Sequence, residues 1–238
     1  MKYAIIAAGE GSRLAQEGVN VPKPLVEIGG EMLIDRLFRI FMDNGATDIV
    51  VVCNDLNEQV SGHLRDIQQK GRVPLRVVVR TTPSSMHSLA ALSPLLTDEP
   101  FILTTVDTVF SELDFSFYVK VFKRLLASGE ADGLMGVTDF IDDESPLYIE
   151  TDHQMNITAF LDETASPYYI SGGIYGLTPI SLETLQRCVD RGESRMRNFQ
   201  RALIADGLRI KAFPFTTVID IDHASDIRKA EVLLKIDK

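Results

Sequence analysis

Apolar runs and helical stripes alternate along the first half of the chain. Continuous apolar runs predict four buried strands, at residues 3–8, 48–53, 73–80 and 101–106. Apolar residues at helical spacing predict helices at residues 32–42, 56–70, 85–96 and 113–127. Because strands alternate with helices, the pattern predicts an α/β fold with a mostly parallel sheet and helices on both faces.

The second half of the chain has a different rhythm. Short strand-like pieces at residues 134–137, 147–150, 157–161 and 169–177 are separated by polar turns. Helices are expected at residues 180–191, 196–206 and 224–236, and strands at residues 210–214 and 217–221 that close the sheet. Because no internal repeat or clear linker interrupts the chain, residues 1–238 are interpreted as one domain with a small β-rich lobe.

Charge and cysteine content narrow the function classes. The chain has 34 acidic and 24 basic residues and a net charge of −10, which argues against general binding to nucleic acid or an anionic membrane. Cys53 and Cys188 have no metal-ligand spacing and indicate a reducing environment. No run approaches a membrane span in length and the N-terminal apolar stretch is too short for a signal peptide, so a cytoplasmic location is expected.

The segment after the first predicted strand carries the strongest chemical signal. Gly9 and Gly11 form a tight loop whose backbone amides can converge on phosphate oxygens, because no Cβ blocks the approach. Arg13 and Lys23 supply the positive charge that a triphosphate requires in a cleft poor in water. An ordinary strand-to-helix turn would explain the glycines alone, and Leu14 stands where a dinucleotide-binding fingerprint has its third glycine.

Two linked motifs here resemble the signature of the sugar-phosphate nucleotidylyltransferase superfamily, which is G-x-G-[ST]-R-[LM] followed, ten residues after the arginine, by the lysine of P-K-P-L. The matching residues are Gly9, Gly11, Ser12, Arg13, Leu14, Pro22, Lys23, Pro24 and Leu25. The resemblance implies a Rossmann-like, three-layer fold, a loop that holds a nucleoside triphosphate, and Arg13 and Lys23 as catalytic residues. The loop residues are Ala7, Ala8, Gly9, Gly11 and Ser12. The resemblance also implies a nucleotide-binding half, residues 1–112, and an acceptor-binding half, residues 113–238, that closes the metal site.

Three aspartates are the candidate ligands of Mg²⁺. Asp107 follows the fourth predicted strand, where a carboxylate is well placed to hold Mg²⁺ against triphosphate oxygens. Strand alternation would put Asp220 and Asp222 on one face. In the family that the chain resembles, a strand-end aspartate and a second acidic or amide residue before a late helix bind the catalytic metal. Either Asp220 or Asp222 is then the second ligand, unless Asp107 caps a turn and Asp222 caps the last helix.

The loop at residues 82–90 stands where the family recognises its nucleobase. Family members commonly carry a Gly-Thr pair here, whereas this chain has His87-Ser88. Ser88-Leu89 resembles the cytidylyltransferase branch that acts on phosphocholine-type substrates. Ser84 and Ser88 are therefore candidate nucleotide-binding residues, although Ser84 or Ser85 is also expected to cap the following helix. His87 is interpreted as a loop or packing residue, because the nucleotidyl transfer that the family catalyses requires no histidine base.

Gly172 and Gly173 lie in a segment that resembles the strand lining the family's acceptor pocket. Two glycines weaken a strand unless a ligand approaches the backbone closely or a bulge is needed. Family members often carry Glu-Lys-Pro upstream, with the lysine on the acceptor phosphate, and residues 162–164 here contain no lysine. The acceptor phosphate would then be held by Arg195 or Arg197, unless these arginines are solvated helix residues.

The sequence therefore predicts an enzyme that transfers a nucleoside monophosphate from a nucleoside triphosphate to a phosphorylated small molecule, of the sugar-phosphate type, with release of pyrophosphate and with Mg²⁺ as cofactor. The expected partners are these two small molecules, with no nucleic acid and no membrane. The alternatives are a cytidylyltransferase for a phosphocholine-like acceptor, a molybdenum-cofactor guanylyltransferase, and a nucleotide-binding regulatory module without turnover. A glycosyltransferase is disfavoured because Asp107-Thr108-Val109 lacks the second aspartate of an Asp-x-Asp motif.

Overall fold

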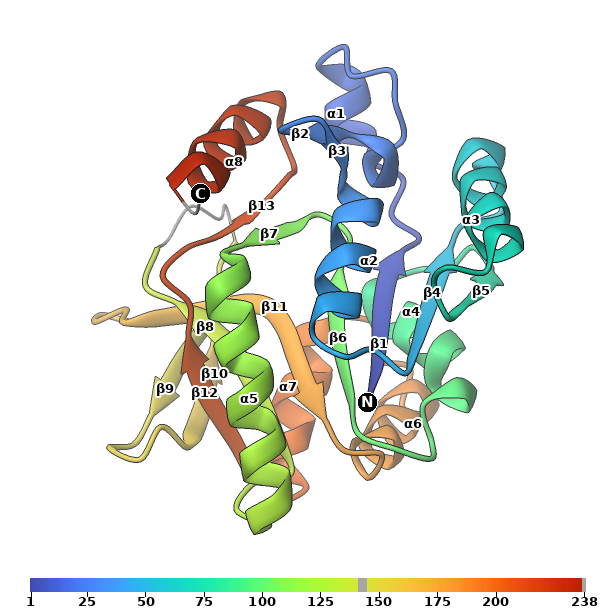
Figure 1. The fold of residues 1–238 in the computed structure, drawn as a ribbon. Coiled ribbons are helices and arrows are strands. Elements are labelled where there is room, and N and C mark those ends of the chain that lie inside the picture. Colours follow the sequence, from blue (N-terminus) through green and yellow to red (C-terminus); the bar gives the residue numbers. More distant parts are fainter. Residues whose placement is uncertain (141–144, 237–238) are drawn as a thin grey trace.

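The fold is built outward from β1 (Lys2–Ala7), which is buried along its whole length in the computed structural model (Figure 1). The structure describes residues 1–140 and 145–236. Successive side chains of β1 point to opposite faces of the sheet, so Tyr3 and Ile5 enter one hydrophobic core and Ala4 and Ile6 enter another. Burial on both faces explains the continuous apolar sequence of this strand.

Parallel strands form the first part of the main sheet. β1 pairs with β4 (Asp48–Cys53) on one side and β6 (Phe101–Thr105) on the other, and β4 also pairs with β5 (Leu75–Val79). The resulting order is β6-β1-β4-β5. The carboxyl ends of all these strands meet at one edge, which is where ligands of such sheets bind.

Antiparallel pairing builds the second part of the sheet around β11 (Tyr169–Leu177). This strand pairs with β6, with β8 (Gly133–Thr138) and with β9 (Tyr148–Thr151). β10 (Ile157–Leu161) pairs with β9, and β12 (Ile210–Pro214) is a parallel partner of β8. Within the described residues these strands make one sheet of nine, so the predicted β-rich lobe is continuous with the parallel part.

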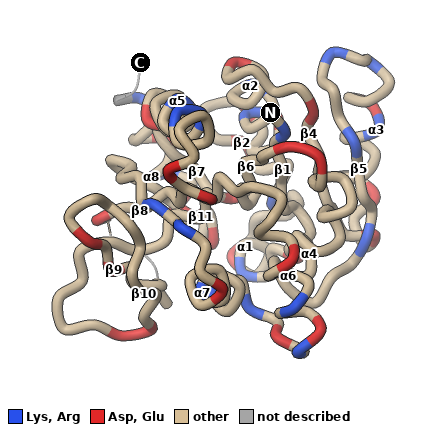
Figure 2. Tube along the Cα trace, turned by 90° about the horizontal axis from the view of Figure 1, so that it is seen from below, with Lys and Arg blue, Asp and Glu red and all other residues tan. Residues whose placement is uncertain are grey.

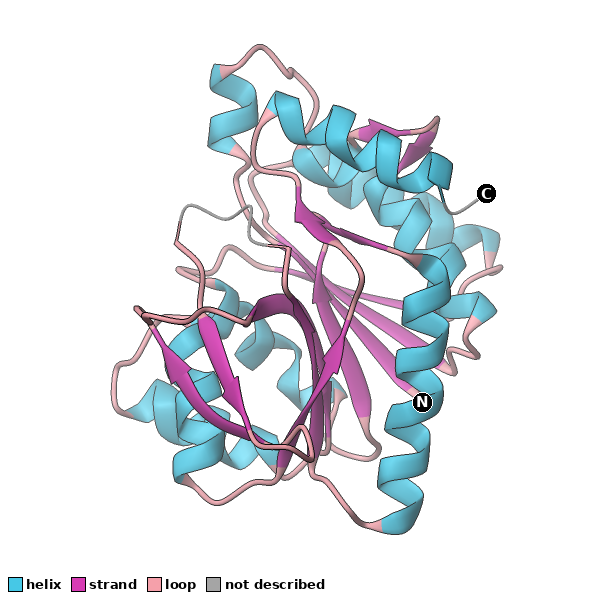
Figure 3. Cartoon of the chain, turned by 90° about the vertical axis from the view of Figure 1, so that its left-hand side faces the viewer, coloured by secondary structure: helices cyan, strands magenta, loops and turns pink. Residues whose placement is uncertain are grey.

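Helices cover both faces of the sheet and give the fold three layers (Figure 3). One face packs against α2 (Leu33–Asp43), α3 (Glu58–Lys70), α5 (Glu112–Ser128) and α8 (Ala224–Ile236). The opposite face packs against α4 (Ser85–Leu92), α6 (Ser181–Asp190) and α7 (Met196–Ala205). On the first face Tyr3 stacks on Phe41, with ring centroids 4.5 Å apart. The predicted Rossmann-like α/β fold with a mostly parallel sheet is confirmed.

The expectation that residues 217–221 close the main sheet is wrong. β13 (Val218–Asp220) pairs instead with β7 (Thr108–Phe110) in a separate two-stranded sheet. The reason lies in packing, because Val218 and Ile219 are buried in the core that the sheet forms with α2, α3, α5 and α8. The pairing places Asp220 opposite Thr108, directly after the fourth predicted strand and its aspartate.

Several short elements have no counterpart in the hydrophobic pattern. They are α1 (Ser12–Gln16), β2 (Glu27–Ile28), β3 (Glu31–Met32) and a 3-10 turn at Lys23–Leu25. The helix expected over residues 85–96 is also shorter than predicted, since α4 ends at Leu92 and a 3-10 turn follows at Ser93–Leu95. Pro94 explains this change, because proline has no N–H to donate to a continuing α-helix.

Acidic and basic residues are interspersed along the folded chain (Figure 2). Positive charge at a binding site therefore comes from a few local side chains. Among the helices that the structure describes, none combines the length and the apolar character needed to cross a membrane.

Asp162 fastens α7 to the β-rich lobe. Its carboxylate pairs with Arg197 at 2.6 Å and with Arg201 at 2.8 Å. Arg201 also donates to the carbonyl oxygen of Phe160 at 3.1 Å. Hydrogen bonds from Arg201 and Arg197 lower the pKa of Asp162 from its ordinary value of 3.8.

Asp162→Asn should lower stability at neutral pH, and this difference from wild type should narrow as the pH falls below about 4. A carboxyl group with a lowered folded-state pKa contributes stability above its unfolded pKa, and the contribution is lost as the pH falls through the folded value. Urea midpoints of both proteins across this range check the prediction. Added salt should also narrow the difference, because the ion pairs are exposed. A difference independent of pH would contradict the assigned role of the carboxylate.

Candidate active site

A cavity of about 430 Å³ opens at the carboxyl edge of the parallel strands. We call it the glycine-loop cavity. It is lined by Ile6, Ala8, Gly9, Glu10, Gly11, Lys23, Asn54, Leu56, Thr81, Thr82, Pro83, Ser84, Ser85, Ser88, Thr105, Val106 and Asp107. The glycine loop and Asp107 thus share a cleft, as the strand order requires.

The conformation of the loop depends on Gly11. This residue has φ = 63°, a left-handed conformation that glycine adopts without steric cost. A Cβ at this position would lie 3.2 Å from Cβ of Lys23, so the loop packs directly against the lysine turn. The short helix α1 follows and is anchored by buried Leu14. Ala7 is buried in the core and is not among the described lining residues of the cavity.

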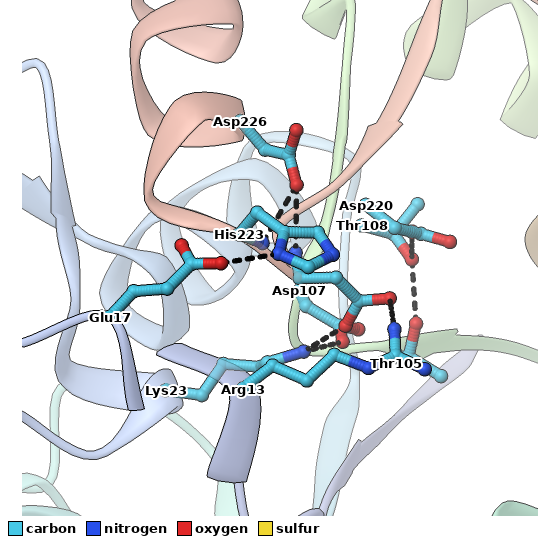
Figure 4. A network of polar contacts seen from close by, with 10 residues as sticks. Arg13, Glu17, Lys23, Thr105, Asp107, Thr108, Asp220, His223 and Asp226 are labelled. Atoms are coloured by element: carbon cyan, nitrogen blue, oxygen red, sulfur yellow. Dashed lines mark hydrogen bonds and ion pairs between the residues drawn. The ribbon is translucent and has the colours of Figure 1, made fainter. Parts of the chain in front are cut away.

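Lys23 lies at the centre of a polar network (Figure 4). Its ammonium is 2.7 Å from Oδ2 of Asp107 and 2.7 Å from Oδ1 of Asp222. Arg13 donates from Nη1 to Oδ2 of Asp222 at 3.1 Å. The side chain of Lys23 is only 10% exposed, so these contacts replace most of its hydration. The structure thereby brings together four of the predicted site residues from distant parts of the chain.

Lys23 and Asp222 hold each other in the charged form. Burial alone would lower the pKa of Lys23, but the charges and hydrogen bonds of Asp107 and Asp222 raise it above its ordinary value. Burial alone would raise the pKa of Asp222, but the hydrogen bond and charge of Lys23 lower it overall. This ion pair is therefore fully formed near neutral pH.

The two C-terminal aspartates have different surroundings. β13 ends at Asp220, so Asp222 lies in the turn beyond it, and the expectation that alternation places both on one strand face is wrong. Asp220 accepts a hydrogen bond from Thr108 at 2.9 Å, whereas Asp222 contacts Lys23 and Arg13. Because Asp107 and Asp222 share one ammonium, Asp222 is favoured over Asp220 as the partner of Asp107.

Asp107 and Asp222 suit a magnesium site that a nucleotide completes. Each lies 2.7 Å from the same ammonium, so the space between them already accepts a cation. Mg²⁺ commonly takes one or two protein carboxylates and fills its other positions with water and phosphate oxygens. The described residues contain no group of three His, Cys, Asp or Glu side chains arranged to hold a metal.

Hydroxyl and amide groups also line the glycine-loop cavity. Of the two serines expected as the cap of α4, it is Ser84 that caps the helix through its side chain. Ser88 is 1% exposed and shares a 2.6 Å hydrogen bond with Thr82. Asn54 follows β4 and donates to the carbonyl oxygen of Ala8 at 3.3 Å, and its Oδ1 has no partner within the described part of the chain. These groups offer hydrogen bonds to a nucleobase or ribose.

A second cavity, of about 390 Å³, lies at the N-terminal end of α8. We call it the α8 cavity. It is lined by Arg13, Thr138, Phe140, Ser145, Ile170, Ser171, Gly172, Val218, Asp220, Asp222, His223, Ser225, Asp226 and Lys229. Gly173 has φ = 69°, and the pairing of β11 with β8 shifts register between Ser171 and Tyr175, so the bulge considered for the two glycines is present.

A cavity of about 120 Å³ lies between the other two. It is lined by Gly11, Ser12, Arg13, Lys23 and Asp222. It shares Gly11 and Lys23 with the glycine-loop cavity, and it shares Arg13 and Asp222 with the α8 cavity. The two predicted catalytic cations therefore stand at the junction of the two larger cavities.

The two candidate arginines near the start of α7 differ in position. Arg195 precedes the helix and is exposed. Arg197 pairs with Asp162 and donates to the carbonyl oxygen of Ser145 at 2.9 Å, and Ser145 lines the α8 cavity. Neither arginine is itself among the described lining residues, but Arg197 contacts the cavity wall.

The fold and the site are those of an α/β protein with a glycine loop and clustered cations at the carboxyl edge of parallel strands, an arrangement suited to phosphate groups. The family model for nucleotidyl transferases matches residues 2–234. The chain therefore belongs to the nucleotidyl transferase family. It is an enzyme of the nucleotidyltransferase type, as predicted.

Curated relatives support this assignment. A UTP–glucose-1-phosphate uridylyltransferase of Haloferax volcanii is 27% identical over 243 residues, which cover 99% of this chain and 97% of the relative. A probable mannose-1-phosphate guanylyltransferase of Oryza sativa is 27% identical over 192 residues, which cover 78% of this chain and 52% of the relative. The match to the rice protein thus spans about half of that protein's length.

Solved structures share the fold along almost the whole chain. The inositol-1-phosphate CTP transferase from T. maritima has a TM-score of 0.79 and 19% identity, covering 100% of this chain and 96% of its own. A putative glucose-1-phosphate thymidylyltransferase from Bacillus anthracis has a TM-score of 0.83 and 18% identity, covering 98% and 94%. At these identities the likeness concerns the fold alone.

The sequence motifs did not indicate some residues of the site. Asn54 follows β4 just as Asp107 closely follows β6, so the strand-end rule could have found it. Lys229 lines the α8 cavity and pairs with Asp226 at 3.2 Å, at a helical spacing of three residues that is visible in the sequence. Thr108 and Glu17 contact the last segment of the chain, and no local pattern indicates these contacts.

Gly11→Ala should destabilise the protein and disturb Lys23. An alanine at this positive φ is strained and its Cβ would crowd that of Lys23, so the free energy of unfolding should fall by about 1–2 kcal/mol. Gly9→Ala is the matched control, because Gly9 lies outside the positive-φ region and a Cβ added there would meet open space. Urea unfolding of both variants measures the difference. Equal losses would show that the backbone conformation of Gly11 is unimportant.

Proposed function

We propose that this protein transfers a nucleoside monophosphate from a nucleoside triphosphate to a sugar phosphate or a similar phosphorylated small molecule, with release of pyrophosphate and with Mg²⁺ as cofactor. Family membership supports the type of reaction. The relatives named for glucose 1-phosphate and mannose 1-phosphate support the class of acceptor.

The observation that carries this proposal is the position of Arg13 and Lys23 between two cavities. The glycine-loop cavity is lined by the glycine loop and Lys23, which suit a triphosphate, and by the hydroxyl groups of Ser84 and Ser88, which suit a base or ribose. The α8 cavity then receives the acceptor. The α-phosphorus of a triphosphate at the junction would meet positive charge and lie within reach of an acceptor in the α8 cavity.

The proposed reaction is a single displacement at the α-phosphorus. A phosphate oxygen of the acceptor forms the new P–O bond, while the bond from the α-phosphorus to the oxygen bridging the β-phosphorus breaks and its electron pair leaves with pyrophosphate. Because the attacking phosphate is already anionic, no general base is required. Lys23 and Arg13 offset the negative charge, and the loop amides hold the triphosphate in line.

Asp107 and Asp222 are the proposed metal ligands. When bound, Mg²⁺ supplies charge neutralisation at the triphosphate oxygens and the departing pyrophosphate. Asp220, which accepts a hydrogen bond from Thr108, remains an alternative second ligand.

The proposed acceptor site comprises the Gly172-Gly173 strand and the wall that Arg197 holds. Buried phosphate must be met by cations or amides, because an unpaired phosphate is too costly to desolvate. Residues 162–164 contain no lysine. Among the described residues, the basic side chains that line the α8 cavity are Arg13, His223 and Lys229.

A cytidylyltransferase for a phosphocholine-like acceptor is the second candidate. The pair Ser88-Leu89 resembles that branch and therefore favours it, and Ser88 is buried in the wall of the glycine-loop cavity. A glucose-1-phosphate cytidylyltransferase of Salmonella typhimurium also matches, at 38% identity over 53 residues, or 22% of this chain and 21% of the relative. Phe140 and three aspartates line the α8 cavity, and such groups suit a quaternary ammonium.

Pyrophosphate release from ATP, CTP, GTP and UTP with Mg²⁺, against glucose 1-phosphate, mannose 1-phosphate, inositol 1-phosphate and phosphocholine, tests the function. One pairing should show acceptor-dependent release. Lys23→Ala should lower its turnover by about 100-fold or more, because Lys23 is a buried cation that lines both the glycine-loop cavity and the small cavity at the junction. The circular dichroism spectrum should stay that of the folded protein. Undiminished turnover in Lys23→Ala would contradict the proposed catalytic role of Lys23.

Arg197→Ala and Arg195→Ala should have unequal effects. Because Arg197 holds the Ser145 segment of the α8 cavity wall and Arg195 is exposed before the helix, only the first change should raise the acceptor KM several-fold, with the nucleotide KM unchanged. Steady-state kinetics on the active pairing checks this, with Arg195→Ala as the matched control. Equal, negligible effects on the acceptor KM would show that neither arginine contributes to acceptor binding.

A further inference from the structure

Glu17 connects the glycine-loop segment to the last helix (Figure 4). It is the C-cap residue of α1, and its N–H donates to the carbonyl groups of Arg13 and Leu14 at 3.2 and 3.1 Å. Its carboxylate reaches the start of α8. Oε1 lies 2.6 Å from Nδ1 of His223, and Oε2 accepts a hydrogen bond from the backbone N–H of Ala224 at 2.7 Å.

Carboxylates are favoured at this end of α8. The first N–H groups of a helix have no partner within it, and the helix dipole attracts negative charge there. Asp226 contributes a second carboxylate, whose Oδ2 accepts hydrogen bonds from the N–H groups of Asp222 at 3.2 Å and His223 at 2.8 Å. The three consecutive N–H groups of residues 222–224 are therefore all held by Glu17 and Asp226.

The backbone segment held in this way carries the side chain of Asp222. Arg13 and Glu17 are four residues apart, and both contact this segment, Arg13 at the Asp222 carboxylate and Glu17 at the backbone of Ala224. From the other side, the N–H of Ile221 bonds to the carbonyl oxygen of Asp107 at 3.1 Å. The position of the Asp222 carboxylate relative to Asp107 thus depends on a few contacts, of which Glu17 supplies two.

We propose that Glu17 is a positioning residue that holds Asp222 beside Asp107, so that the two carboxylates can share one divalent cation. The inference rests on the proposed function, and it adds a residue outside the motifs of the family signature. A purely structural cap would lower thermal stability when removed and leave metal affinity unchanged. A positioning role requires that metal affinity falls as well.

The dissociation constant of Mn²⁺, determined by electron paramagnetic resonance without acceptor and therefore without turnover, tests the proposal. It is measured on the protein alone and with whichever of ATP, CTP, GTP and UTP raises the wild-type Tm most. Glu17→Ala should weaken Mn²⁺ binding about 10-fold, as loss of a residue that orients a ligand commonly does. Glu17→Asp should weaken it similarly, because the charge remains but the side chain is one methylene too short. Glu17→Gln should weaken it less, because an oxygen remains to accept from Ala224.

Glu31→Ala is the matched control. Glu31 is also a partly exposed glutamate held by polar contacts, here with Arg39, at 34% exposure against 38% for Glu17, and its loss should leave Mn²⁺ affinity unchanged. Asp107→Asn is the positive control and should weaken binding at least as much as Glu17→Ala. Should Glu17→Ala fail to fold, Glu17→Asp and Glu17→Gln decide the matter.

Wild-type Mn²⁺ affinity in Glu17→Ala or Glu17→Asp overturns the proposal, and so does an equal loss in Glu31→Ala. A wild-type protein that binds no Mn²⁺ under either condition overturns it too. If the expected order of affinities is found but no substrate pair releases pyrophosphate, the proposed function fails while the positioning role of Glu17 stands.

Discussion

The ammonium of Lys23 lies 2.7 Å from a carboxylate oxygen of Asp107 and 2.7 Å from one of Asp222, and this shared ion pair constrains the surrounding structure. A lysine that is only 10% exposed is tolerated when its charge is paired, because unpaired charges are costly to bury. The three groups come from three separate turns, which follow α1, β6 and β13. These turns must therefore meet at one point.

Parallel pairing brings the glycine loop and the Asp107 turn together, and the lysine turn packs against Gly11 of that loop. β1 and β6 are neighbours in the sheet, so the glycine loop and Asp107 emerge at the same edge. The third turn comes from the far end of the chain and depends on the small β7–β13 sheet, whose register places Asp220 opposite Thr108. The charged centre therefore draws on both halves that the motifs distinguish, residues 1–112 and 113–238.

Long local patterns explain what could be predicted from sequence. Strands at residues 48–53, 157–161, 169–177 and 210–214 lie at the expected positions, because burial on one or both faces leaves a run or alternation of apolar residues. Gly11, Lys23 and Asp107 could be assigned to one cleft from the strand order and the motif. The pairing of β13 with β7 could not, because a strand of three residues has no periodicity that identifies its partner. The place of Asp222 in a turn and the reach of Glu17 across 206 residues depend on that pairing and were equally hidden.

The net charge of −10 and a polyphosphate substrate are compatible because screening confines each charge to its neighbourhood, within about 8 Å at physiological ionic strength. Under the proposed function, what matters is the local exchange of partners. Lys23 and Arg13 are already engaged by Asp222 and Asp107, so a triphosphate with its metal ion replaces one set of partners by another. Arg13 is 55% exposed and gains less from this exchange than buried Lys23, whose interactions are less screened. The positive charge that is proposed to act in catalysis is therefore held in ion pairs within the site rather than displayed as a basic surface.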